Sequence, residues 1–242
     1  MRILLTNDDG INAPGILALA KWAMTLGEVT VVAPKIEQSG KSHGIEIVRP
    51  MEIKKVDFPL NLPAYAVDST PADCVRLAIL GMHEKFDMVI SGINKGLNIG
   101  CDIMYSGTVG AVFEAYALGV PYAMALSTEP KAYEGIVSHM DRVWQFVTEH
   151  KLFDIHPIYN INIPAPAGEF RFTRQGSAYY SDDFAPEEND MYLPCGKAVW
   201  EDSGSMELDT DAVLRDGCIS VMPLTICRAD LNAYDTLKKM FP

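Results

Sequence analysis

The 242-residue sequence predicts an α/β fold with a doubly wound, largely parallel sheet and a smaller, β-rich C-terminal part. Two observations favour this class. Short apolar runs without polar alternation, typical of strands buried on both faces, recur between segments with helical periodicity. Each run ends in a turn that is polar or contains glycine, where a strand would give way to a crossover helix. This alternation continues to about residue 164.

The first expected element is a strand over 3–5, followed by a helix from Pro14 that ends at Gly27. Residues 45–56 alternate in polarity and predict an exposed hairpin. Further strands are expected at 28–33, 64–67, 87–90, 122–126 and 158–163, and further helices at 71–80, 106–118 and 133–151. A Rossmann-like core over residues 1–164 follows from this order.

The pattern changes in residues 165–242, which we expect to form a C-terminal excursion with a hairpin, an acidic loop, a strand and a final helix. The acidic stretch 182–190 predicts a mobile loop or an arm that faces a partner. The strand is expected at 218–225 and the helix at 232–241. Because 170–205 contains few core-sized apolar residues, we expect this unit to mediate oligomerisation.

Composition excludes several classes of partner. The net charge is −12, with 20 basic residues and no basic cluster, which disfavours nucleic acid because phosphate neutralisation needs a basic face. No apolar run is long enough for a membrane span or a signal segment, so we expect a cytoplasmic protein. The five cysteines lack CxxC spacing and are expected to be reduced thiols.

Polar clusters follow three of the predicted strands. Asp8 and Asp9 end the first strand, Ser39 follows the second, and Asn94 follows the strand at 87–90. Because the carboxyl ends of parallel strands share one edge, these side chains can converge there, where open α/β sheets bind ligands. Adjacent carboxylates repel by about 4 kcal/mol at ~4 Å and an effective dielectric near 20. An all-oxygen ligand set suits one Mg²⁺ or Mn²⁺ ion.

The alternative for the first cluster is a solvated Asp-Gly turn with an Asx cap, and Asn94 alone is typical of a turn. Ser106, Gly107 and Thr108 open a helix after a glycine-rich loop, an arrangement that suits a phosphate group. The alternative there is a plain serine N-cap. A phosphate ligand remains compatible with the acidic chain because a bound cation would supply positive charge.

Two short motifs lack the context that they need. Residues 40–44 match GxSxG, but a loop precedes them and a β-like stretch follows, whereas a nucleophile elbow needs a strand and then a helix. Gly40-Lys41-Ser42 resembles the end of a P-loop, yet Lys35 occupies the place of the upstream glycine. No GxGxxG follows the first strand. His43 is either a proton shuttle or a solvated loop residue.

Longer segments carry a family resemblance. They are 3–15 (ILLTNDDGINAPG), 33–34 (AP), 38–40 (QSG), 70–74 (TPADC), 91–98 (SGINKGLN), 105–110 (YSGTVG) and 220–224 (SVMPL). These segments, in this order along the chain, resemble the survival protein SurE family. The resemblance implies a divalent-metal-dependent phosphatase that acts on nucleoside 5′- and 3′-monophosphates. It also implies dimers or tetramers that exchange the C-terminal hairpin and helix.

The resemblance assigns the metal ligands to Asp8, Asp9, Ser39 and Asn94. Asp8 and Asp9 are the candidate catalytic residues, and either Asp8 or an activated water is the nucleophile. The candidate substrate-binding residues are Asn12, Gly40, Ser106, Gly107 and Thr108. The sequence departs from the family at 178–184 (AYYSDDF), where relatives usually carry an Asp-Pro-Arg-Gly and a Tyr-Trp segment. The resemblance therefore does not define the base preference or the geometry of assembly. The alternatives are a non-catalytic metal- and phosphate-binding module and a structural oligomer with a vestigial site.

Overall fold

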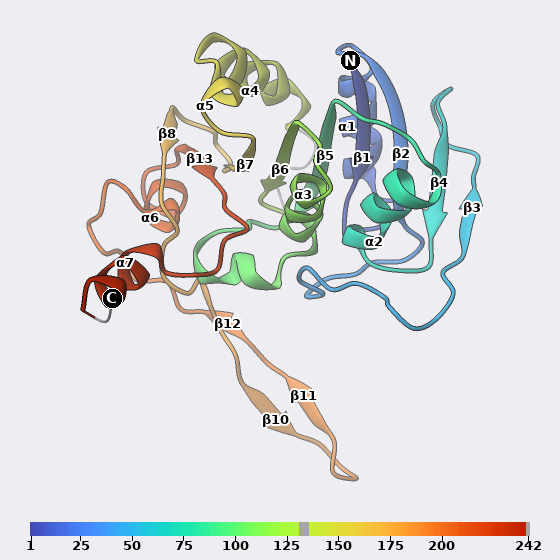
Figure 1. The fold of residues 1–242 in the computed structure, drawn as a ribbon. Coiled ribbons are helices and arrows are strands. Elements are labelled where there is room, and N and C mark those ends of the chain that lie inside the picture. Colours follow the sequence, from blue (N-terminus) through green and yellow to red (C-terminus); the bar gives the residue numbers. More distant parts are fainter. Residues whose placement is uncertain (131–135, 241–242) are drawn as a thin grey trace.

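A computed structural model describes residues 1–130 and 136–240 of the chain (Figure 1). Its main sheet has nine strands within the described residues. From one edge to the other they are β3 (Ile53–Lys55), β4 (Ala64–Val67), β2 (Glu28–Pro34), β1 (Arg2–Thr6), β5 (Met88–Lys95), β6 (Tyr122–Thr128), β7 (Ile158–Ile163), β13 (Ile219–Pro223) and β8 (Phe170–Phe172). The strands from β4 to β7 are mutually parallel, whereas β3 and β13 are antiparallel to their neighbours β4 and β7.

Helices cover both faces of the sheet. The core on one face joins α1 (Pro14–Ala23) and α4 (Val137–Glu149) to the sheet. The core on the other joins α2 (Pro71–Arg76) and α3 (Gly107–Ala117) to it, and a π-helical turn, η1 (Leu77–Gly81), continues α2. Ile3 and Leu5 of β1 belong to the first core and Leu4 to the second, so the central strand is buried on both sides. This architecture confirms the predicted fold class.

The predicted exposed hairpin at 45–56 is wrong. Only β3 forms there, and its partner is β4. The carboxylate of Glu46 accepts hydrogen bonds from the backbone N–H groups of Val48 and Arg49, at 2.8 and 3.1 Å. Pro50 has no N–H group to offer a ladder. Local side-chain bonds therefore replace the strand pairing that the alternating polarity suggested.

The helix predicted at 133–151 is α4, which begins at Val137 and ends at Glu149. Residues 133–135 lie outside the described part of the chain. Lys151 has a left-handed φ of 50° in the turn before α5 (Leu152–Ile155), which is why the helix does not continue through it.

The C-terminal part contributes β8 and β13 to the main sheet and also forms a projecting arm (Figure 1). Two short antiparallel ladders build the arm. They are β9 (Tyr180–Ser181) with β12 (Lys197–Ala198), and β10 (Phe184–Pro186) with β11 (Tyr192–Pro194). The acidic stretch 182–190 lies in this arm, which therefore has hairpin structure rather than being only a loop.

Three more helical segments complete the described chain: η2 (Gly100–Tyr105), α6 (Asp209–Leu214) and α7 (Leu231–Met240). The predicted final helix corresponds to α7, which buries none of its residues. The strand expected at 218–225 is the shorter β13. Within residues 1–130 and 136–240, no helix combines the length and apolarity needed to cross a membrane.

Candidate metal and phosphate site

The site begins in the turn after β1. The side chain of Asn7 closes this turn, since its Nδ2 donates to the Gly10 carbonyl at 2.9 Å and its Oδ1 accepts from the Gly10 N–H at 3.2 Å. Gly10 has a φ of +97°, a conformation that favours glycine. The Asx turn of the alternative interpretation is therefore present, but it belongs to Asn7. Asp8 and Asp9 are left at the carboxyl edge of the sheet.

Backbone contacts bring the three polar strand ends together. In the sheet β1 lies between β2 and β5. The Gln38 N–H donates to the carbonyl of Asp8 at 2.7 Å, which places the loop after β2 beside the turn. On the other side, the Lys95 N–H donates to Asp9 Oδ2 at 3.0 Å. Ser39 and Asn94 are the chain neighbours of these two donors, so the three strand ends lie at one edge of the sheet.

The paired carboxylates both have a raised pKa. Asp8 is only 6% exposed, and this burial, together with the charge of Asp9, raises its pKa to about 6 despite hydrogen bonds from Thr108. Burial also raises the pKa of Asp9 and the nearby Glu37 carboxylate adds to that effect, although the N–H group and the charge of Lys95 lower it. No ion pair to Asp8 or Asp9 occurs among residues 1–130 and 136–240. A cation here would relieve both the burial penalty and the mutual repulsion.

The remaining donor atoms fit a hard cation. Asn94 Nδ2 donates to the Gly96 carbonyl at 2.8 Å, which leaves its amide oxygen as the atom able to bind a metal. Ser39 Oγ donates to Glu37 Oε1 at 2.6 Å and keeps its lone pairs. In the described part of the chain, no three His, Cys, Asp or Glu side chains gather into a possible metal site. A cation at this edge would therefore need the oxygens of Ser39 and Asn94 beside the carboxylates.

The start of α3 packs directly on Asp8. Thr108 Oγ1 donates to Asp8 Oδ1 at 2.6 Å, and the Thr108 N–H donates to Oδ2 at 3.3 Å. A Cβ atom on Gly107 would lie 3.1 Å from the Cβ of Asp8, a tight contact, so this close approach favours a glycine. The hydroxyl of Ser106 accepts from the Val109 N–H at 3.1 Å, the simple N-cap of the alternative interpretation. Thr108 thus orients a carboxylate, a role that the sequence did not suggest.

The two other candidate substrate-binding residues lie at the rim. Gly40 is exposed with a φ of +70°, and a Cβ atom there would meet nothing within 4 Å, so its backbone conformation rather than space selects glycine. Asn12 is exposed in the turn before α1. The N-cap of that helix is Ala13, which makes no side-chain cap.

Sequence reasoning missed a buried amide cluster behind the site. The Asn98 N–H donates to Asn162 Oδ1 at 2.8 Å, and the Asn98 carbonyl accepts from Asn160 and Asn162 at 2.8 and 2.9 Å. These bonds hold the segment that follows Asn94 against β7. A signal was present, because two asparagines in the otherwise apolar run 158–163 need buried partners.

His43 is not the freely solvated loop residue that was one of the two alternatives. Its Nε2 lies 2.6 Å from Glu114 Oε2 of α3, and only a quarter of its side chain is exposed. It is therefore not solvated freely, and its ring is engaged by a carboxylate.

A doubly wound parallel sheet with oxygen donors gathered at its carboxyl edge places the protein among α/β proteins that bind ligands at that edge. The family model of survival protein SurE matches residues 3–182, and the chain belongs to that family. A protein named 5′-nucleotidase SurE from Desulforudis audaxviator is 39% identical over 99% of this chain and 97% of its own. A protein of the same name from Natranaerobius thermophilus is 36% identical over 98% of this chain and 97% of its own. The crystal structure of the SurE protein from Aquifex aeolicus covers the whole of both chains, with a TM-score of 0.78 and 31% identity.

Proposed function

We propose that the protein is a divalent-metal-dependent phosphatase that releases phosphate from nucleoside 5′- and 3′-monophosphates, with Mg²⁺ or Mn²⁺ as its cofactor. The observation that carries the proposal is the pair of adjacent carboxylates beside the start of a helix, buried at Asp8 and partly buried at Asp9, both with a raised pKa. The relatives named 5′-nucleotidase support the substrate class.

In this proposal Asp8, Asp9, Ser39 and Asn94 hold the cation, which would stabilise negative charge on the phosphate and lower the pKa of a bound water. Thr108 keeps the carboxylate of Asp8 in one orientation through its two hydrogen bonds. The exposed loop at Gly40 leaves room for phosphate oxygens next to the site. Either Asp8 or a water attacks phosphorus, and rapid-quench trapping of a phospho-enzyme distinguishes the two.

The test is a screen of phosphate release from 5′-AMP, 5′-GMP and 3′-AMP with Mn²⁺ or Mg²⁺, before and after exhaustive EDTA treatment. We expect release from both classes of monophosphate, complete loss with EDTA and recovery when metal is restored. Release that EDTA leaves unchanged would remove the metal from the proposal. Calorimetric binding of Mn²⁺ without any turnover would favour the non-catalytic binding module instead.

We also propose that the chain forms a homodimer or homotetramer through its C-terminal part. Exposed apolar side chains support this, because Leu231, Tyr234 and Leu237 lie along α7 and Tyr192 and Leu193 lie on the arm, each more than half exposed. Deletion from Asn232 onward should shift the protein to smaller species in analytical ultracentrifugation. An unchanged sedimentation profile would rule out assembly through α7.

A further inference from the structure

A buried ionic cluster joins α2, α3 and the loop that carries Ser39. The carboxylate of Glu114, on α3, is the centre of this cluster and its side chain is 8% exposed. One oxygen lies 2.6 Å from His43 Nε2 and the other 2.9 Å from a guanidinium nitrogen of Arg76. Burial alone would raise the pKa of Glu114, but its bonds to His43 and Arg76 outweigh that effect and lower it. Both oxygens of the carboxylate are thus engaged, one by His43 and the other by Arg76.

The loop is attached to the body immediately beyond Gly40. The Ser42 N–H donates to the carbonyl of Tyr105 at 2.9 Å. Gly110 of α3 permits this approach, since a Cβ atom there would lie 2.6 Å from the Ser42 carbonyl oxygen. Beyond His43, Thr70, the N-cap residue of α2, donates its hydroxyl to the Gly44 carbonyl at 2.7 Å. Residues 42–44 are therefore fixed between α2 and α3, which lie side by side in Figure 1.

Ser39 and Gly40 themselves have few contacts. Gln38 is tied to Asp8 through its N–H, and Ser39 bonds only to the nearby Glu37 among the described residues. Both Ser39 and Gly40 are exposed. The position of this short stretch therefore depends on the two attachments that flank it, at Gln38 and at residues 42–44.

We propose that His43 and Glu114 are positioning residues whose side-chain contact holds Ser39 and Gly40 at the metal and phosphate site. The inference rests on the proposed function, because it assigns Ser39 to the metal and Gly40 to the phosphate. Neither member of the pair contacts Asp8 or Asp9, so each acts through the loop. A contact to a buried carboxylate suits this task, because a buried carboxylate that loses a hydrogen-bond partner costs free energy. The loop is therefore favoured in the position that keeps His43 against Glu114.

The test compares His43→Ala, His43→Gln and Glu114→Gln with the unchanged protein. Phosphate release from 5′-AMP gives kcat and KM, and a Mn²⁺ titration gives the activating metal concentration. We expect His43→Ala to lower kcat/KM by roughly a hundredfold, the scale of a displacement near 1 Å, and to raise the Mn²⁺ requirement. His43→Gln should recover most of this loss, because its amide nitrogen can donate to Glu114.

Asp216→Asn is the matched control, because Asp216 also pairs with arginines, Arg171 and Arg215, but lies far along the chain from the loop. It should lower the melting temperature without changing kcat/KM or the Mn²⁺ requirement. A loss in Asp216→Asn equal to that in Glu114→Gln would show that any weakened ion pair reduces activity, and would overturn the inference. So would wild-type kinetics in His43→Ala.

A second readout is independent of turnover. Lys41 is exposed between Ser39 and His43, so the rate of tryptic cleavage after Lys41 reports how firmly the loop is held. Cleavage should accelerate in His43→Ala and Glu114→Gln and stay unchanged in Asp216→Asn. Unchanged cleavage in all variants would refute the positioning role. If the unchanged protein released no phosphate, the proposed function would fail, while Mn²⁺ calorimetry and this cleavage assay would still decide the positioning role.

Discussion

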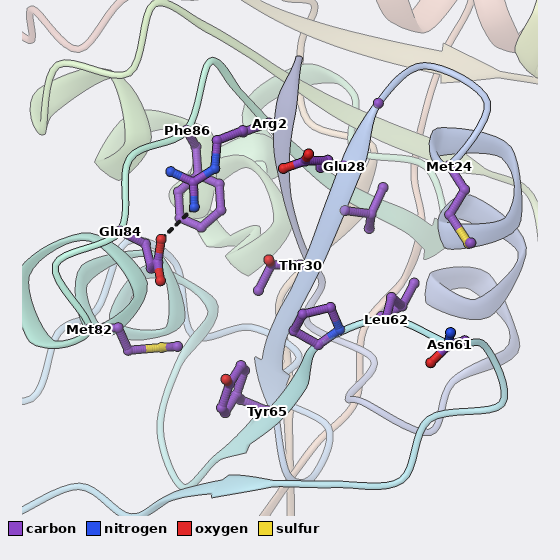
Figure 2. A pocket seen from close by; sticks show the side chains of 13 residues that line it. Arg2, Met24, Glu28, Thr30, Asn61, Leu62, Tyr65, Met82, Glu84 and Phe86 are labelled. Carbon is purple, nitrogen blue, oxygen red and sulfur yellow. Dashed lines mark hydrogen bonds and ion pairs between the residues drawn. The ribbon is translucent and has the colours of Figure 1, made fainter.

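At the amino edge of the sheet, a hollow of about 450 Å³ is lined by charged and aromatic side chains from the starts of the strands (Figure 2). The guanidinium of Arg2 pairs there with Glu84 and lies 5.6 Å from the ring centre of Phe86. At the carboxyl edge, after the end of β1, Asp8 and Asp9 lie together and form no ion pair among the described residues. Each edge gathers polar groups, but only at the carboxyl edge is an aspartate buried with its pKa raised to about 6.

This difference separates a structural cluster from a candidate site. Arg2 and Glu84 are both more than 40% exposed, so solvent screens them and their pairing costs little. Asp8 is 6% exposed and its pKa is raised, so the protein maintains an unfavourable arrangement at that edge. Strain of this kind persists in a folded protein where a ligand compensates it.

The sharpest test of the comparison changes one acid at each edge. Asp9→Asn removes a charge with little change in shape, and we expect phosphate release to fall by more than roughly a hundredfold, since even outer partners of metal ligands are worth about 10- to 100-fold. Glu84→Gln makes the same chemical change at the amino edge and should leave turnover as it was. Steady-state assays at saturating Mn²⁺ measure both. Comparable losses in the two variants would abolish the distinction between the edges.

The second prediction uses the pKa of Asp8 in chelator. An acid whose pKa is higher in the folded than in the unfolded chain loses stability as it ionises, so the penalty grows as pH rises from about 4 to about 6. A rise from 3.8 to about 6 corresponds to roughly 3 kcal/mol. Asp8→Asn lacks this titration. Its free energy of unfolding, relative to that of wild type, should therefore rise by roughly 3 kcal/mol as pH increases from about 4 to about 6.

Denaturant melts of both proteins at several pH values check this, because the other titrations cancel in the difference. In saturating Mn²⁺ the order should reverse, since wild type gains RT ln(1 + [L]/Kd), about 2.7 kcal/mol at a hundredfold excess over Kd. A difference that does not vary with pH in chelator would show that Asp8 ionises without penalty, and would remove the electrostatic argument for a cation.

The contrast between the edges also marks what can be predicted from sequence. The buried runs 3–5 and 87–90 were sufficient to predict the central strands, and parallel topology then placed Asp8, Asp9 and Asn94 at one edge. Local periodicity failed at 45–56, where the single side chain of Glu46 bonds the backbone in place of a strand partner.

The contacts that define the site geometry could not be predicted, because they join residues far apart in sequence. Thr108 meets Asp8 across 100 positions and His43 meets Glu114 across 71. Both contacts depend on how α3 packs on its neighbours, at Gly107 against Asp8 and at Gly110 against Ser42 and His43. Helix periodicity indicates which face is buried, but not which neighbour a given side chain will meet.

The smallest expected effect concerns the two neutral ligands. Asn94→Ala and Ser39→Ala each remove one uncharged oxygen donor and leave the carboxylate pair intact, so we expect Mn²⁺ affinity to fall about tenfold, or roughly 1.4 kcal/mol. The fold should persist, because Ser39 is exposed and Asn94 is only half-buried at the end of β5. Calorimetric titration with Mn²⁺ measures the loss directly. Thr30→Ala, on the wall of the amino-edge hollow, is the control and should bind Mn²⁺ as wild type does. If both ligand variants also bound Mn²⁺ with unchanged affinity, the carboxylates alone would hold the cation, and the convergence of three strand ends would have no chemical role.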